Sequence, residues 1–275
     1  MKKYFQVMKG TWEEYMTYRL NFILWRVRVI MQLLVVYFLW TALFSQGQSN
    51  NLASSSGQTN FFGFTKPMIL SYIVLTGLVR TFVLGTTTME IGSIINQGDL
   101  SNYLIRPLNF FSYYLAKDTA DKILNLVFAF VEISLILFIL RPMVFIQVDP
   151  GLLVLTIFSL FIGMGIYFSF SIILSFLAFW TPDIWAPRFL SFVIIEFFAG
   201  GLFPLDILPK PLFILSQYLP FSYFIYFPLT IYIGHLNQSS IIYGLIIGIV
   251  WAIVLWSLAK IIWKKGLKEY AAQGR

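Results

Sequence analysis

Three ionisable side chains lie inside long apolar stretches of the sequence, where each needs a partner or a function. They are Arg80, Glu132 and Glu196. A charge at the centre of a bilayer costs about 3 kcal/mol or more, so such residues pair with one another or face a water-filled path. We expect Arg80 to pair with Glu132 or with Glu196. The pair would either fix the register of two helices or contact a transported molecule, and a proton-coupled carrier would also use buried carboxylates.

Other reactive groups are scarce in this chain. It has no cysteine and one histidine, His235. Thiol catalysis, cysteine-ligated metals and sites built on several histidines are therefore excluded. No segment matches the phosphate-binding pattern GxxxxGK[ST], so we expect no nucleotide site of that type. A membrane-embedded enzyme would need a polar catalytic cluster, and the sequence offers none.

The composition is that of an integral membrane protein. Hydrophobic residues make up 59% of the chain and charged residues 11%, with a mean hydropathy of +0.79. Soluble proteins carry about a quarter charged residues. A helix needs about 20 apolar residues to cross a bilayer, so spans consume most of the length. We expect one all-α membrane domain covering residues 1–275.

The apolar segments predict six transmembrane helices. Their approximate ranges are 22–44, 67–88, 122–140, 152–180, 188–203 and 240–263. A polar, uncharged stretch at 45–60 separates the first two and is expected outside. Arg26 and Arg28 lie near the start of the first span, where long basic side chains reach the headgroups.

The region 204–234 is apolar but is interrupted by prolines. Pro204, Pro209, Pro220 and Pro228 cut it into pieces too short to cross a membrane. We expect half-helices that dip in from the outer face and return, a re-entrant segment between the fifth and sixth spans. The aromatic residues around Tyr223 fit an outer interfacial belt, or they line a path for an amphipathic cargo.

Residues 1–21 favour an amphipathic helix in the inner interface. Large apolar side chains recur there at helical spacing, namely Tyr4, Phe5, Met8, Trp12, Tyr15 and Met16. Such a stripe indicates contact with lipid or protein. The alternative is a solvated tail.

The basic residues set the orientation of the spans. With the N-terminus inside, 15 of the 19 Lys and Arg residues fall on the cytoplasmic side. The exceptions are Lys66, Arg141 and Lys210, which fall outside, and Arg80 within a span. Cytoplasmic loops of membrane proteins are enriched in Lys and Arg, so six spans with both termini inside satisfy this rule. The net charge of +7 therefore indicates an anionic membrane surface rather than nucleic acid.

The polar stretch at 90–121 carries a resemblance to a known family. Its pattern is a glycine, a short acidic and apolar helix, a Pro-Leu turn and a helix with a basic residue, seen here at Gly98, Asp99, Leu100, Tyr103, Leu104, Arg106, Pro107, Leu108 and Lys117. This resembles the loop between the second and third spans of ABC-2 type permeases, the membrane subunits of a class of ABC transporters. A second match is similar to the family's outer segment and is carried by Gly201, Phe203, Pro204, Leu208, Pro209, Pro220, Ser222 and Tyr223.

The resemblance implies a cytoplasmic coupling loop at 90–121. Gly98 can supply a turn, Asp99 can cap a helix of roughly two turns, and Pro107 can end it. Leu100, Tyr103 and Leu104 would then present an apolar knob to an ATPase subunit, with Asp99 and Arg106 at its rim. The alternative is an ordinary interfacial loop whose aromatic residues rest on headgroups.

The resemblance also implies a function. It predicts a permease subunit that exports an amphipathic, lipid-like or drug-like molecule by ATP-driven alternating access, working as a homodimer or with a related permease. The partners would be ABC ATPase subunits, which would hold ATP and Mg²⁺, and membrane lipids. This chain would bind no cofactor and lie in the cell membrane. An ion-coupled secondary transporter or channel is the alternative, and transport that follows ion gradients and ignores ATP would favour it.

The orientation is directly testable. A cysteine or tag placed after Arg275 should be accessible only from the cytoplasmic side in intact cells, because the last span is followed by a basic tail. Labelling that reaches it from outside would overturn the six-span topology.

Overall fold

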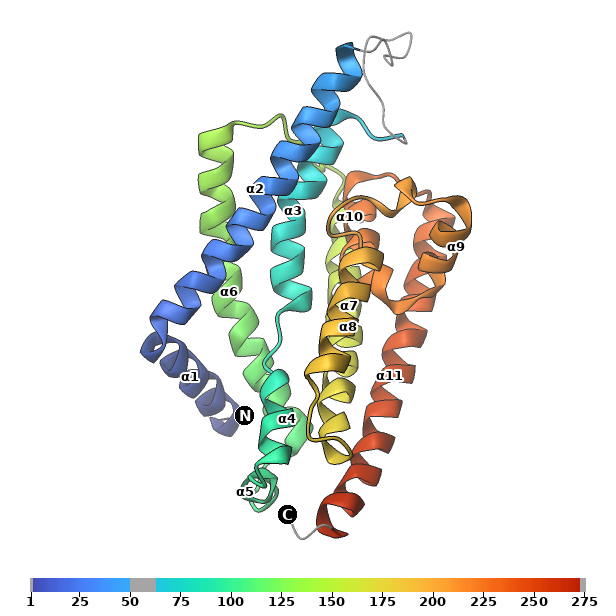
Figure 1. The fold of residues 1–275 in the computed structure, drawn as a ribbon. Helices are drawn as coiled ribbons and strands as arrows, with labels where there is room; N and C mark the ends of the chain where they lie inside the picture. Colours follow the sequence, from blue (N-terminus) through green and yellow to red (C-terminus); the bar gives the residue numbers. More distant parts are fainter. Residues whose placement is uncertain (1, 50–62, 273–275) are drawn as a thin grey trace.

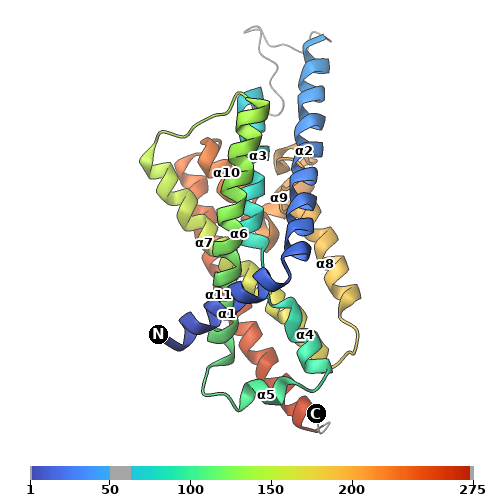
Figure 2. The same ribbon diagram turned by 90° about the vertical axis from the view of Figure 1, so that its left-hand side faces the viewer.

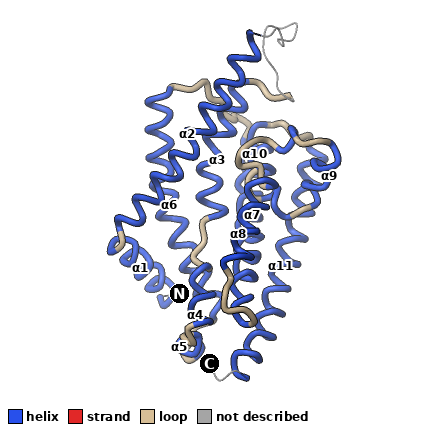
Figure 3. Tube along the Cα trace, in the orientation of Figure 1, coloured by secondary structure: helices blue, strands red, loops and turns tan. Residues whose placement is uncertain are grey.

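The protein is a bundle of helices joined by loops (Figures 1 and 3). This computed structural model describes residues 2–49 and 63–272, so most of the loop predicted at 45–60 lies outside the described residues. The α-helices are α1 Lys2–Thr17, α2 Arg19–Ser49, α3 Lys66–Leu84, α4 Met89–Asn96, α5 Leu100–Leu104, α6 Phe110–Leu140, α7 Pro150–Phe176, α8 Trp185–Phe198, α9 Lys210–Tyr218, α10 Tyr226–Ile233 and α11 Gln238–Ala272.

Local signals at the ends explain two of the long helices. The Asn109 side chain accepts a hydrogen bond from the Ser112 amide at the start of α6. Asp149 does the same from the Gly151 amide at the start of α7, where Pro150 takes the first helical position. Helix α6 ends at Arg141, which adopts a left-handed conformation with φ of 43°.

Five described helical segments are long and apolar enough to cross a membrane. They are Arg19–Gln46, Lys66–Asn96, Phe110–Leu140, Pro150–Phe179 and Gln238–Tyr270. They correspond to five of the six predicted spans. The remaining prediction, 188–203, falls on α8, whose 14 residues extend about 21 Å at 1.5 Å per residue.

The path of the chain shows in which direction α8 runs through the bundle. In Figure 1, α7 and α11 both begin at the upper end of the bundle and finish at the lower end. The chain between them therefore returns upward through α8. Both termini, α4 and α5 lie toward the lower end, while α9 and α10 lie in the upper half.

The helices do not end where the predicted spans do. Helix α6 begins at Phe110, within the predicted loop 90–121, so the helix expected there with Lys117 continues directly into the predicted third span. Phe110, Phe111 and Tyr114 at its start pack against aromatic residues of α7 and α11. The second predicted span, 67–88, is helical in α3 only as far as Leu84, and Gly85 to Thr88 form a break before α4.

Region 204–234 is divided into short helices, as its prolines predict. Leu205–Ile207 and Pro220–Tyr223 are 3₁₀-helices on either side of α9. Helix α10 packs on α3 and α7, with Tyr226 and Phe227 buried. The predicted interfacial belt of aromatic residues is wrong, since Tyr223 and Phe224 are also buried and form the core between α3, α7, α10 and α11.

The backbone of Tyr223 packs directly against α7, and only a glycine at position 163 of that helix leaves room for it. A Cβ on Gly163 would lie 2.5 Å from the Tyr223 carbonyl oxygen, closer than atoms can approach. Glycine at this position of α7 therefore lets the 3₁₀-helix at Pro220–Tyr223 approach the bundle directly.

Helix α1 is attached to α6 and crosses it at a steep angle (Figure 2). The Trp12 indole donates to the Ala120 carbonyl at 2.8 Å, and the Tyr15 hydroxyl donates to Asp121 Oδ1 at 2.5 Å. Burial, with the Asp121 carboxylate beside it, raises the pKa of the Tyr15 phenol above its ordinary value. Part of the predicted apolar stripe thus docks on protein, while Phe5 and Met16 stay exposed.

A buried cluster of charges closes the break between α3 and α4. The Lys122 ammonium of α6 donates to the Gly85 carbonyl and lies 3.0 Å from Asp118 Oδ2, and both side chains are almost fully buried. Asp118 also accepts from the Thr87 amide at 3.3 Å. On the other side of the break, Thr88 bonds to two serines of α7. The break is therefore fixed to α6 and α7.

Loss of one partner in this cluster should be costly. We expect Lys122→Met to lower the free energy of unfolding by about 3–5 kcal/mol, because Asp118 would remain buried without its cation. Chemical unfolding in bicelles, followed by tryptophan fluorescence, measures this. The matched control is Lys9→Met, since the Lys9–Glu13 pair is exposed and should contribute less than about 1 kcal/mol. Equal effects of the two substitutions would contradict a structural role for Lys122.

Candidate functional site

The predicted coupling segment forms a compact projection at the lower end of the bundle. Gly98 ends α4 with φ of 83°, a conformation that favours glycine, and its carbonyl accepts from the Tyr270 hydroxyl of α11 at 2.6 Å. Helix α5 follows and ends before Arg106, because the residue preceding Pro107 is kept out of helical conformation. The turn at Gly98 and the stop at Pro107 are confirmed.

Two details of this segment were predicted wrongly. Helix α5 has five residues, less than the two turns expected. Asp99 stands at its N-cap position without a capping hydrogen bond, and its carboxylate accepts instead from the side-chain amide Nδ2 of Asn102 at 3.3 Å. Its backbone is in the helical region, with ψ of −5°, whereas a capping residue is extended.

The apolar knob is composed differently from the prediction. Leu100 is fully buried and packs with Ile91 and Ile95, so it anchors the projection instead of facing a partner. Leu104 is 46% exposed and Ile105 is 82% exposed. The sequence analysis did not identify Ile105 as part of the knob. Its position directly before Arg106 and Pro107, where the helix has to end, was the signal that could have found it.

Arg106 and Tyr103 flank this exposed tip. The Arg106 guanidinium lies 4.7 Å from the centre of the Tyr103 ring, in cation–π contact. Burial of the ring raises the pKa of Tyr103. The projection thus presents an apolar tip, a cation and Asp99 at the lower end of the molecule.

The projection is mounted on α6 and α7. Leu100 belongs to a cluster with Tyr114, Phe176 and Tyr270, which joins α5 to α6, α7 and α11. Lys117 of α6 also donates to both oxygens of Glu90 in α4 at 2.8 Å. A force on the tip would therefore reach α6, α7 and α11 through packed side chains.

The intramembrane charges form two separate ion pairs. Arg80 donates to both oxygens of Glu196 at 2.6 Å, and Gln32 lies 3.4 Å from the same carboxylate. Glu132 pairs instead with Arg26, which bonds to both its oxygens. Of the two expected partners of Arg80, Glu196 is confirmed. The prediction that Arg26 reaches the headgroups is wrong, since it is 7% exposed and bound to α6.

The Arg80–Glu196 pair joins three predicted spans. Arg80 lies on α3, Glu196 on α8 and Gln32 on α2. Beside Arg80 a cavity of ≈ 30 Å³ is lined by Gln32, Thr76 and Gly201 among others. A water molecule needs about 10–15 Å³ of such space, so this cavity has room for a water or two and none for a cargo molecule.

The outer residues quoted for the resemblance support this arrangement. The Arg80 guanidinium lies where a side chain on Gly201 would be, so glycine there admits the ion pair. Pro204 precedes one 3₁₀-helix, Pro209 lies at the N-cap of α9, and Pro220 opens the second 3₁₀-helix. The hydroxyl of Tyr223 donates to the Gln217 carbonyl at 3.1 Å. These residues shape the fold of the upper half.

A double-mutant cycle tests the pairing. Arg80→Gln and Glu196→Gln should each destabilise the protein, and the double variant should lose less than the sum, with a coupling energy of about 1–3 kcal/mol. The control is the cycle of Arg80 with Glu132, which should be additive within about 0.5 kcal/mol, because each residue has a different partner. Unfolding in bicelles gives all the values. Coupling between Arg80 and Glu132 would contradict the arrangement.

Comparison with known proteins identifies the family. The chain matches the family described as ABC-2 family transporter protein over residues 29–274, a range that includes the projection and the Arg80–Glu196 pair. The curated proteins include no match to the sequence. Permeases of this family associate with ABC ATPase subunits. This chain is therefore a multi-pass membrane protein that belongs to the ABC-2 transporter family, a permease of an ABC-type transporter.

Proposed function

We propose that this chain is the permease subunit of an ATP-driven exporter of an amphipathic, lipid-like or drug-like molecule. The observation that carries the proposal is the exposed tip at Leu104 and Ile105, mounted on a projection whose base is buried in the bundle. Separate ATPase subunits, holding ATP and Mg²⁺, would bind this tip. Closure of the ATPases on ATP would push the projection and alternate the access of a transport path.

The path lies between two permease copies in this proposal. The small cavity beside Arg80 cannot hold a cargo, whereas α2 and α8 expose rows of large apolar side chains. On α8 these include Phe189, Leu190 and Val193, and on α2 Met31 and Val35. A second copy, or a related permease, would enclose a cleft against these faces. Lipid would cover the rest of the exposed apolar surface of the bundle.

The proposed topology has six crossings with both termini cytoplasmic. Five helices have the length to cross, and the return between α7 and α11 runs through α8. Helix α8 and the residues up to 203 would be the sixth crossing, and region 204–234 would be re-entrant from the outer face. Helix α1 would lie in the inner interface of the cell membrane, where its exposed Phe5 and Met16 meet lipid.

The tip gives the sharpest test of coupling. We expect Ile105→Asp to lower the affinity for the cognate ATPase subunit at least about tenfold. A charge buried in the interface should reduce the binding free energy as much as the loss of a hot-spot side chain does. Copurification after co-expression and ATPase activity in proteoliposomes measure the effect. The controls are Ile105→Leu, which keeps the apolar surface, and Ile139→Leu, which changes an exposed apolar residue elsewhere.

Two results would decide between ATPase-coupled export and an ion-coupled transporter or channel. Folding should be unchanged in Ile105→Asp, because the side chain is 82% exposed. Full ATPase binding by this variant would reject the tip as the contact. Transport by the wild-type protein that follows an ion gradient and ignores ATP would instead favour a secondary transporter or channel.

A further inference from the structure

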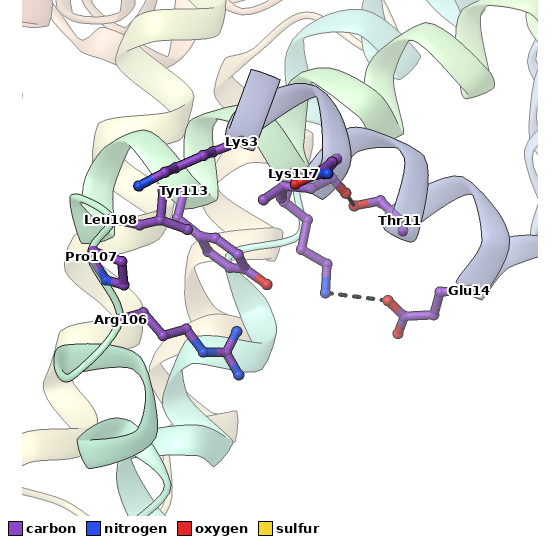
Figure 4. A pocket seen from close by; sticks show the side chains of 11 residues that line it. Lys3, Thr11, Glu14, Arg106, Pro107, Leu108, Tyr113 and Lys117 are labelled. Carbon is purple, nitrogen blue, oxygen red and sulfur yellow. Dashed lines mark hydrogen bonds and ion pairs between the residues drawn. The ribbon is translucent and has the colours of Figure 1, made fainter. Parts of the chain in front are cut away.

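Among the ion pairs of the described residues, one depends on a proton. The lysines and arginines of the other pairs titrate above about pH 10 and stay charged near neutrality. Lys117, for example, lies 3.4 Å from Glu14 beside the cavity shown in Figure 4. In the upper half of the bundle, Nε2 of His235 instead lies 3.7 Å from Oδ1 of Asp206. An imidazole gains or loses its charge between about pH 5 and 8, so this contact changes with pH.

The Asp206 carboxylate has few partners of its own. Its Oδ1 accepts a hydrogen bond from the Tyr226 hydroxyl at 2.9 Å, while its Oδ2 is buried without a hydrogen bond. In the part of the chain that the structure describes, no lysine or arginine forms an ion pair with it. A carboxylate is costly to bury without compensation, so a positive charge on His235 stabilises it.

His235 is held in place by its own turn and by an aromatic ring. Gly234 ends α10 in the left-handed conformation, with φ of 74°, and the His235 amide donates to the Thr230 carbonyl at 3.0 Å. The imidazole stacks on the Phe64 ring, with ring centres 4.1 Å apart and an angle of 21° between the planes. A cation over the face of an aromatic ring is attracted by it, so Phe64 also favours the protonated imidazole.

The neighbouring groups keep one charge state over the range in which histidine titrates. The polar or ionisable residues on the surrounding elements are Lys66, Tyr72, Gln147, Lys210 and Tyr226. Glutamine is uncharged, and phenols and lysines ordinarily titrate at about pH 10. Burial, with the Asp206 carboxylate beside it, raises the pKa of the Tyr226 phenol further. A change of charge at this contact between about pH 5 and 8 is therefore assigned to His235.

The contact joins three segments that are far apart in the sequence. Phe64 precedes α3 and packs with Trp40 of α2. Asp206 belongs to the 3₁₀-helix Leu205–Ile207, between α8 and α9, and His235 lies in the turn between α10 and α11 (Figure 1). A proton on His235 therefore fastens the ends of α2 and α3 to the turn before α11.

We propose that His235 and Asp206 form a latch that closes when His235 binds a proton. The closed latch holds the imidazolium beside the carboxylate, so the closed state binds the proton more tightly than the open state does. By linkage, a fall in pH through the range of histidine titration favours the closed latch, and a rise in pH loosens it. In the proposed topology the latch lies on the outer side and responds to external pH. It is independent of ATPase coupling, so its failure would leave the proposed transport function unaffected.

Hydrogen–deuterium exchange of the full-length protein in nanodiscs tests the latch. Peptides that cover residues 203–209 and 230–237 are compared at about pH 5.5 and about pH 8, on either side of ordinary histidine titration. Exchange is corrected for the intrinsic effect of pH, and a peptide from α7 is the internal reference. We expect both outer peptides of the wild type to be protected about fivefold more at the acidic pH, the upper end of the range for a partly exposed ion pair.

Three variants assign the effect to the pair. His235→Phe keeps the ring stack but cannot bind a proton, and Asp206→Asn removes the negative charge but keeps an acceptor for Tyr226. Both should show equal protection at the two pH values. The matched control is Lys210→Gln, which removes an exposed charge from the same region and should keep the pH dependence. Thermal unfolding shows that each variant is folded before exchange is compared.

The remaining outcomes overturn the proposal. Equal protection of the wild type at both pH values rejects the latch, and this comparison needs no variant. Greater protection at the alkaline pH contradicts the sign of the linkage. A pH dependence that survives in Asp206→Asn shows that the proton acts without the carboxylate. Loss of the pH dependence in Lys210→Gln assigns it to the overall surface charge instead of the pair.

Discussion

The buried contact of Lys122 with Asp118 and the Gly85 carbonyl is the interaction on which the lower half of the structure depends. A helix that breaks inside a membrane protein leaves carbonyl and amide groups without partners, and each is costly in an apolar environment. Lys122 and Asp118 supply those partners from α6. The break can then redirect the chain from α3 into α4, toward the projection.

Several helices meet around this contact. Asp121, which directly precedes Lys122 on α6, accepts a hydrogen bond from the Tyr15 hydroxyl of α1. Across the break, Ser175 of α7 accepts from Arg188 of α8 and donates to the Thr88 carbonyl. Hydrogen bonds thus connect α1, the end of α3, α6, α7 and α8 at the level where the projection begins. A movement of the projection would therefore be shared by these helices.

The upper half is organised by a different pair of charges. Arg80 and Glu196 make a bidentate contact that draws α8 toward α3, although α8 has few other neighbours in the bundle. Burial of an ion pair gains little stability over a well-packed apolar contact, but it specifies which residues meet. In this molecule it fixes the height of α8 relative to α3. Large apolar side chains of α8 and α2 are left exposed on the outside of the bundle.

The sequence by itself determined the class, most spans and the order of the elements, because apolar length and proline positions act locally along the chain. It also located the turn at Gly98 and the stop at Pro107. It left open which carboxylate meets Arg80, and it misplaced Leu100 and Arg26. Only the tertiary structure decided these points, since burial and ion pairing join residues more than ninety positions apart. The exposure of Ile105 was also decided by the tertiary structure, because the packing of neighbouring side chains buries Leu100 and leaves Ile105 exposed.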